Sequence, residues 1–227
     1  TLYRRDPGTG DLVAGIPLGP YRPAEGSYEQ SIVFGEGAIW VATGGSNGAA
    51  IVRVDPQTNR VVRHIEVGSF FSLAAGEGGV WLLGRDGLAR IDPRTNKLGA
   101  THPLPGLPHR MAAGEGALWV VRGEPRVREE SVLMKLDPKT ITVTAEIRFG
   151  YAGPLVVAGG AVWVLDLEGW IAKVDPLLAK ITHRIQVIAG FGPPDLAVGA
   201  GSVWLTRHEG PDQETIILQR IAADRFK

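Results

Sequence analysis

Two histidines and a glutamate are the side chains of this sequence best suited to proton transfer. His109 lies near the middle of the chain, and His208 and Glu209 are neighbours near its end. An imidazole changes charge near neutral pH, and a carboxylate beside it can orient it, so the set could act as acid and base or bind a metal ion. The two imidazoles meet only if the fold brings distant segments together. We therefore assign no catalytic residue and no metal site, and keep a His/Glu enzyme as the alternative.

Arginine and aspartate side chains make up a second candidate set, which is suited to binding. Its charged members are Arg110, Arg122, Asp166, Asp195 and Arg207. A planar guanidinium can hold a carboxylate or a phosphate through two hydrogen bonds. Together with His109, His208 and Trp170, the set predicts a site for a small anionic ligand or for a peptide or protein. The competing interpretation is that these charges pair with one another or face water.

The elements that must position these side chains are copies of one repeat. The repeat is a glycine-rich turn followed by a tryptophan strand, and its copies are Gly35–Val41, Gly76–Leu82, Gly114–Val120, Ala158–Val164 and Gly199–Leu205. The tryptophan recurs about every 40 residues, which is a period typical of propeller blades. Each unit also contains short runs rich in β-branched residues, bounded by Gly, Pro and Asn, that predict four strands per unit.

A second motif links the expected third and fourth strands of each unit. It reads Asp-Pro-Gln-Thr-Asn from Asp55 to Asn59, and related turns begin at Asp6, Asp92, Asp137 and Asp175. An aspartate side chain can accept a hydrogen bond from the backbone two residues later, and proline presets φ for the next turn position. The motif therefore predicts a tight turn with a structural role.

The repeats predict one all-β domain, residues 1–227, built as a β-propeller of four-stranded antiparallel blades. Blades stacked round an axis cover one another's faces, with the tryptophan between neighbours. Five blades are expected, over residues 31–68, 71–105, 110–150, 154–190 and 195–224. The last unit lacks a clear fourth strand, so we expect residues 2–18 to complete it, which leaves a surplus strand from Leu2 to Arg5 at the rim.

The candidate side chains fall at one end of the predicted blades. The charged members lie at the starts of first strands or three residues after the repeated tryptophan, where the sequence differs from unit to unit, and His109 and His208 stand beside them. Variable loops on a rigid scaffold are where function is usually found. Trp170 is the one tryptophan outside the repeated position. It would suit a binding hot spot if exposed, or packing between blades if buried.

Composition restricts the function classes. Lys plus Arg and Asp plus Glu are balanced at 24 each, which argues against a nucleic-acid partner. There is no cysteine, which excludes disulfides and thiolate metal sites, and we expect no cofactor. No apolar run approaches the ~20 residues of a membrane span, so we expect no membrane insertion. The chain begins at Thr1 without a signal-like segment. We expect an extracytoplasmic or secreted protein, or a domain of a longer one.

The repeat unit resembles one family of bacterial proteins. Ala-x-Gly-Glu-Gly-x-x-Trp-Val with Arg-x-Asp-Pro-x-Thr-Asn, carried by residues 31–207, is similar to the YVTN and streptogramin (virginiamycin B) lyase propellers. The resemblance implies a propeller fold, and it extends to a lyase and to sensor domains of larger receptors. That lyase is seven-bladed and uses a His, a Glu and a magnesium ion. Its catalytic motif has no counterpart here, so no catalytic role is carried over.

These observations favour a non-enzymatic ligand-binding, protein-binding or sensor propeller, as a module of a larger or exported protein. The alternative is a propeller enzyme, lyase-like or hydrolase-like, with a His/Glu site on the variable face. The two differ in whether His109, His208 and Glu209 come within hydrogen-bonding reach of one another.

Overall fold

Every regular element that the structure describes is a β-strand. The computed structural model describes residues 1–19, 32–45, 48–123, 131–150, 152–166, 168–187, 195–209 and 215–222. Within these ranges there is no helix long and apolar enough to cross a membrane. The chain divides into two compact units, Thr1–Leu104 and Pro105–Lys227.

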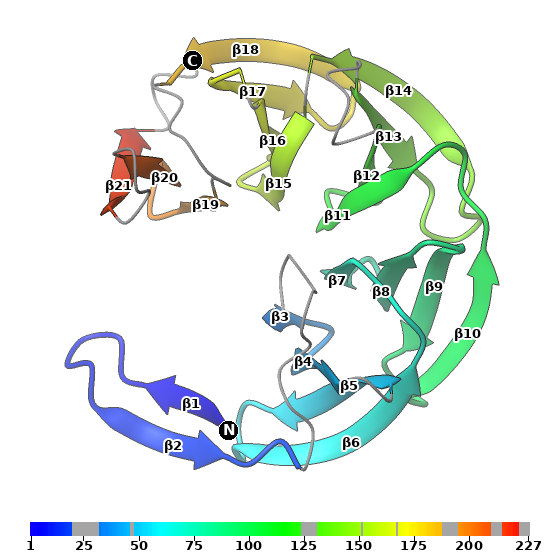
Figure 1. Cartoon of the computed structure of the whole chain (residues 1–227), viewed down its shortest axis with the longest axis vertical. Coiled ribbons are helices and arrows are strands. Elements are labelled where there is room, and N and C mark those ends of the chain that lie inside the picture. Colours follow the sequence, from blue (N-terminus) through cyan, green and yellow to red (C-terminus); the bar gives the residue numbers. More distant parts are fainter. Residues whose placement is uncertain are drawn as a thin grey trace. The chain divides into compact units, whose positions relative to one another are not determined.

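Unit 1, Thr1–Leu104, contains a two-stranded sheet and two four-stranded antiparallel sheets (Figure 1). The two-stranded sheet pairs β1 (Leu2–Arg5) with β2 (Leu12–Ile16). Blade 1 contains β3 (Ile32–Gly35), β4 (Ala38–Gly45), β5 (Gly48–Asp55) and β6 (Arg60–Val67). Blade 2 contains β7 (Ser72–Gly76), β8 (Gly79–Gly84), β9 (Gly87–Asp92) and β10 (Lys97–His102).

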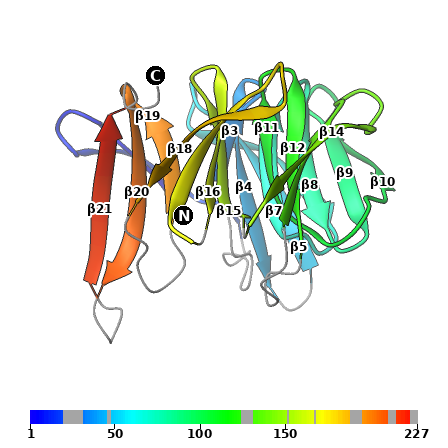
Figure 2. The same ribbon diagram turned by 90° about the horizontal axis from the view of Figure 1, so that it is seen from above.

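Unit 2, Pro105–Lys227, contains three further blade sheets. Blade 3 contains β11 (Pro108–Gly114), β12 (Ala117–Arg122), β13 (Ser131–Leu136) and β14 (Val143–Phe149). Blade 4 contains β15 (Ala152–Ala158), β16 (Ala161–Asp166), β17 (Trp170–Asp175) and β18 (Lys180–Gln186). Blade 5 contains, among the described residues, β19 (Asp195–Gly199), β20 (Ser202–Glu209) and β21 (Thr215–Ala222), which Figure 2 shows as one sheet.

A backbone turn and an indole hydrogen bond recur at the start of every blade. In the first turn of blade 1, Glu36 and Gly37 both have positive φ, as a type I′ hairpin turn requires. The indole nitrogen of each repeated tryptophan donates to the carbonyl five residues earlier, at 2.9 to 3.2 Å. The five repeated tryptophans are therefore fixed in one orientation by their own hairpins.

A cation covers each of these tryptophans. The residue opposite it on the third strand is Arg53, Arg90, Lys135, Lys173 or Arg220, and its charged group lies 5.1 to 5.8 Å from the indole centroid. This is the separation of a cation–π contact. The cation belongs to the Arg-x-Asp-Pro motif, but the motif alone did not predict this contact.

The core lies between neighbouring blades, as predicted. In unit 1, Trp40 and Ile51 of blade 1 pack against Leu82 and Ile91 of blade 2. In unit 2, the equivalent Trp119 and Leu133 of blade 3 pack against blade 4. In blades 1–4 the repeated tryptophans are at most 3% exposed, which makes the face that carries them an interior surface.

The predicted fold class is confirmed: the chain is all-β and has a five-bladed β-propeller fold. Two finer expectations remain predictions, namely that residues 1–227 act as one domain and that residues 2–18 complete blade 5. Among the described residues, β2 pairs with β1, and blade 5 has three strands.

Candidate functional site

The candidate residues all lie in unit 2, and strand pairing places them at one end of their own sheets. Arg122 is opposite Pro108 and Val132, Asp166 is opposite Ala152, and Asp195 is opposite Thr206. The glycine turns and the Asp-Pro turns close the other end of these sheets. We call the ends at Arg122, Asp166 and Asp195 the variable end, because the residues there differ from blade to blade.

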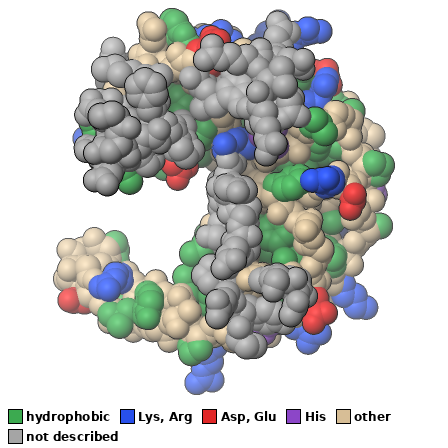
Figure 3. Space-filling view, in the orientation of Figure 1, with side chains coloured by type: hydrophobic (Ala, Val, Ile, Leu, Met, Phe, Trp, Pro, Cys, Tyr) green, Lys and Arg blue, Asp and Glu red, His purple; other side chains and the backbone are tan. Residues whose placement is uncertain are grey.

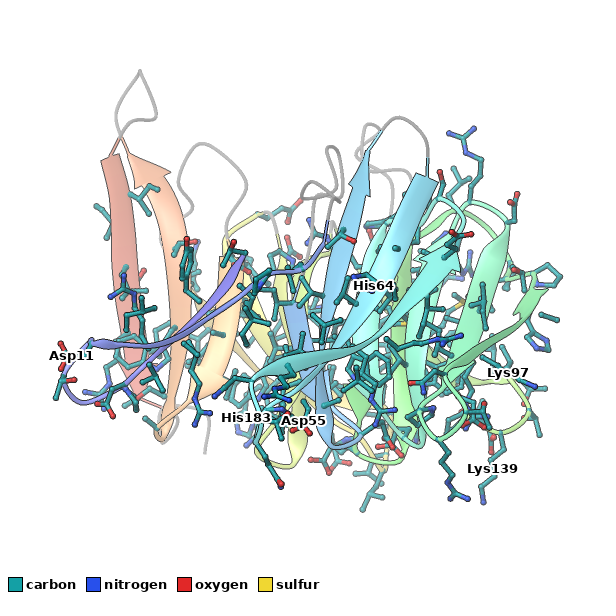
Figure 4. The ribbon with its side chains drawn as sticks, turned by 90° about the horizontal axis from the view of Figure 1, so that it is seen from below. Asp11, Asp55, His64, Lys97, Lys139 and His183 are labelled. Atoms are coloured by element: carbon teal, nitrogen blue, oxygen red, sulfur yellow. The ribbon has the colours of Figure 1, made fainter. Side chains whose placement is uncertain are left out.

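The Asp-Pro turn end is conspicuously uniform by comparison. Asp137 Oδ1 accepts the backbone N–H groups of Lys139 and Thr140, at 2.7 and 3.0 Å, and the turns at Asp6, Asp55, Asp92 and Asp175 repeat this arrangement. Asp55 and Lys139 mark two of these turns in Figure 4. These hydrogen bonds hold the turns together, which agrees with the structural role predicted for the aspartates.

Arg122 is already paired within blade 3. Its Nη2 lies 3.2 Å from Oε1 of Glu146 on β14, and its side chain is 30% exposed. Its Nε is buried and has no hydrogen-bond partner among the described residues. The positive-φ residue Gly106 lies beside it, and a Cβ there would come within 3.4 Å of Nη1. Glu146 therefore engages one nitrogen of the Arg122 guanidinium, and the group keeps further donor capacity that could serve a ligand.

The neighbouring strand β11 presents His109 and Arg110, both half-buried. The pairing of β11 with β12 is irregular between Pro108 and Arg110, so His109 is an extra residue at a β-bulge. Arg110 is opposite Val121, one residue before Arg122. Since successive side chains point to opposite faces of a sheet, Arg110 and Arg122 lie on opposite faces of blade 3.

Arg110, Asp166 and Trp170 share the boundary between blades 3 and 4. Arg110 is on the face of blade 3 with Trp119 and Val121, which packs against blade 4. Asp166 and Trp170 are opposite one another in blade 4, on the face that packs against blade 3. Trp170 is half-buried, so its exposure lies between that of an exposed binding hot spot and that of a residue buried between blades, the two alternatives considered from the sequence.

Asp166 forms part of a turn as well as facing this boundary. Its side chain is 5% exposed, and Oδ1 accepts the backbone N–H of Glu168 at 2.7 Å. Its carbonyl accepts the N–H of Gly169 at 2.9 Å. A Cβ at Gly150 would come within 3.2 Å of Oδ2, so the glycine leaves room for the carboxylate. These contacts fix the position of the acidic group.

Three candidates on β19 and β20 are described less fully. Asp195 is exposed, its Oδ1 accepts the N–H of Leu196, and its own N–H donates to Thr206 Oγ1. The backbones of Arg207 and His208 pair with β21, but their side chains and that of Glu209 lie outside the described part of the structure. The hypothesis of a catalytic pair formed by His109 and His208 with Glu209 therefore stays untested.

Sequence reasoning missed Glu146, the partner of Arg122. Strand pairing shows why the two side chains meet. Glu146 is opposite Met134, and Met134 is opposite Val120. Val120 is two residues from Arg122, so all of these side chains lie on one face of blade 3. Predicting this pair required the register of three strands rather than a motif. Within the described ranges, no group of three or more His, Asp or Glu side chains is arranged to hold a metal ion.

Comparison by sequence finds no relative: no family model matches the chain, and no curated protein matches it. Solved structures do match. Hydrazine synthase of Kuenenia stuttgartiensis has a TM-score of 0.66 at 10% identity, over 92% of this chain and 66% of that one. The extracellular domain of the putative one-component system BT4673 from B. thetaiotaomicron has 0.61 at 15% identity, over 96% and 32%.

AztD from Citrobacter koseri is a third similar structure, with a TM-score of 0.53 at 17% identity over 86% of this chain. The match covers 56% of the AztD chain, so the present chain spans little more than half of that protein. The similar structures are β-propellers with varied roles. At these identities they establish the propeller fold and leave the activity to be argued from the site.

Proposed function

We propose that this chain is a non-enzymatic binding or sensor module that recognises an anionic group, in a small ligand or an acidic peptide, at the variable end of unit 2. We also infer, from the repeat motifs, that it belongs among YVTN and streptogramin lyase-like propellers and serves a larger or exported protein. The observation that carries the binding proposal is Arg122, whose partly exposed guanidinium is paired with Glu146 through Nη2 alone and has an unpartnered Nε among the described residues.

The chemistry of the variable end supports an anion rather than a cation as the ligand. Arg122 and Arg110 provide planar donors from the two faces of blade 3, and His109 lies beside them at the bulge. A guanidinium that is partly screened from water binds carboxylates and phosphates more strongly than an exposed one. In the face shown in Figure 3, acidic and basic side chains are interspersed among the described residues, so recognition rests on local groups.

Binding is tested by thermal shift and calorimetry with citrate, phosphate and a glutamate-rich peptide. A specific anion raises the Tm by linkage. Arg122→Ala should abolish the shift, whereas Glu146→Gln should strengthen binding about 5-fold, because it removes a competing carboxylate worth ~1 kcal/mol. Arg94→Ala, on the Asp92 turn of unit 1, is the matched control and should change nothing. An anion shift that survives Arg122→Ala, or no shift with any of these probes, rejects the proposal.

A further inference from the structure

The N-terminal hairpin β1–β2 reproduces the outer half of a blade. In blade 1 the third and fourth strands slip register directly after Arg53, and the turn that joins them is held by Asp55. The hairpin slips register directly after Arg4, and its turn is held by Asp6 through the same two backbone N–H groups. β1 and β2 therefore have the local structure of a third and a fourth strand.

The contacts of Arg4 give independent support for this equivalence. Arg53 Nη1 donates to the Pro93 carbonyl and to Asn96 Oδ1 of blade 2, at 2.7 and 2.8 Å. Arg4 Nη1 donates to the corresponding atoms of blade 1, the carbonyl of Pro56 at 2.9 Å and Oδ1 of Asn59 at 3.0 Å. Arg4 thus occupies the position of the third-strand cation relative to the following blade.

Apolar packing repeats in the same way. Ile51 and Ile65, which are opposite each other on β5 and β6, pack against Leu82, Ala89 and Ile91 of blade 2. The equivalent pair in the hairpin, Leu2 and Ile16, packs against Val41, Val52 and Val54 of blade 1. The hairpin therefore covers blade 1 as one blade covers the next.

The inner half of this blade is missing from the described residues. In each blade the third-strand cation lies over a tryptophan of the second strand, whereas β1 pairs with β2 alone and neither strand contains a tryptophan. The other face of the hairpin differs from that of a blade, because Arg5 stands where blade 1 has the buried Val54, and Tyr3 and Leu12 on this face are 62% and 55% exposed.

We propose that the edge of β1 that is unpaired among the described residues is a docking site for a β-hairpin of the inner-blade type, whose second strand places a tryptophan under Arg4. An open strand edge pairs readily with a further strand, and the backbone hydrogen bonds of such an added strand supply affinity. The guanidinium supplies specificity, because it is already held by Pro56 and Asn59 at the place where an indole would meet it. This inference is independent of the anion site.

The test extends the full chain with its own inner-blade sequence. Trp170, the first residue of β17, is equivalent to Thr1, so a copy of residues 152–169 fused directly before Thr1 places the copied Trp163 opposite Arg4. The fusion should raise the Tm by several degrees and protect the added indole from acrylamide quenching. Arg4→Ala should lower the Tm more in the fusion than in the parent chain, because only the fusion also loses the cation–π contact.

Matched controls keep the result interpretable. The same fusion with the copied tryptophan replaced by serine should lose most of the gain, and a Gly-Ser extension of equal length should give none. If the added segment instead displaced the original β15 and β16 from blade 4, Arg4→Ala would lower the Tm equally in the fusion and in the parent chain. An unchanged Tm, an exposed added indole or equal Arg4→Ala effects would overturn the proposal. A parent chain that sediments as a dimer and dissociates on Tyr3→Lys, at an exposed position of β1, would assign the edge to a second copy and also overturn it.

Discussion

At the residue scale, the turn aspartates act as fixed acceptors. The backbone N–H groups of Thr140 and Lys139 hold the pKa of Asp137 below its ordinary value of 3.8, and paired backbone donors do the same for Asp6, Asp55 and Asp92. A carboxylate that accepts two N–H bonds is favoured in its charged form. Protonation in acid therefore weakens four turns together.

This shift predicts a definite pH dependence of stability. A pKa that is lower in the folded than in the unfolded chain stabilises the fold above the ordinary value of 3.8, and that stabilisation is lost as the pH falls through the folded-state value. Asp137→Asn should leave the Tm less dependent on pH in this acidic range, because it keeps an acceptor oxygen but cannot titrate. Differential scanning calorimetry from about pH 2 to pH 7 measures the effect.

Asp137→Ala serves as the comparison, since it removes the acceptor as well as the charge. It should lower the Tm by a few degrees at neutral pH, where Asp137→Asn changes it less. A Tm curve for Asp137→Asn that falls in acid as steeply as that of the parent chain would show that this turn does not contribute to acid sensitivity.

At the scale of the element, the third-strand cation joins two blades. Arg53 covers Trp40 within blade 1 and donates to Pro93 and Asn96 of blade 2. In unit 2, Lys135 covers Trp119 and donates to the Pro176 carbonyl of blade 4 at 2.7 Å. The same position is therefore served by arginine in blade 1 and by lysine in blade 3.

The chain itself thus supplies a control for mutating Arg53. Arg53→Ala should cost about 2 kcal/mol, because it loses a cation–π contact and hydrogen bonds from a charged donor. Arg53→Lys should cost less than ~1 kcal/mol, because lysine makes the cation–π contact and the bond to the proline carbonyl in blade 3. Urea unfolding measures both. If lysine proves as costly as alanine, the bridge depends on the planar guanidinium rather than on a positive charge.

The elements were more predictable from the sequence than the site. Local rules are enough for the glycine turn, the Asp-Pro turn and the position of Trp40 between blades, since each depends on residues close in the chain. The pairing of Arg122 with Glu146 depends on the register of three strands, and the half-burial of Trp170 depends on the neighbouring blade. Sequence motifs contain neither kind of information, so the candidates were identified but their partners were not.

At the scale of the whole molecule, each blade face that carries the repeated tryptophan requires a cover. The residue two positions before the third-strand cation is Ile51, Leu88, Leu133 or Ile171 in blades 1–4, and each is fully buried. Its equivalent in blade 5, Leu218, is 63% exposed, and its neighbour on the same face, Ile216, is 62% exposed. Within unit 2, blade 5 is thus packed on one face, against blade 4.

Two substitutions with identical chemistry test the state of this face. Leu133→Ala should cost about 3 kcal/mol, because it leaves a cavity in the core between blades 3 and 4. Leu218→Ala should cost less than about 0.5 kcal/mol if the face meets water, as the exposure of Leu218 indicates. Guanidinium unfolding of both variants gives the comparison. A cost for Leu218→Ala close to that for Leu133→Ala would mean that this face is covered in solution, because the loss of three carbon atoms leaves a cavity only where a second surface packs against the side chain. Such a cover is what the sequence predicts, since residues 2–18 are expected to complete blade 5 and close the ring of blades.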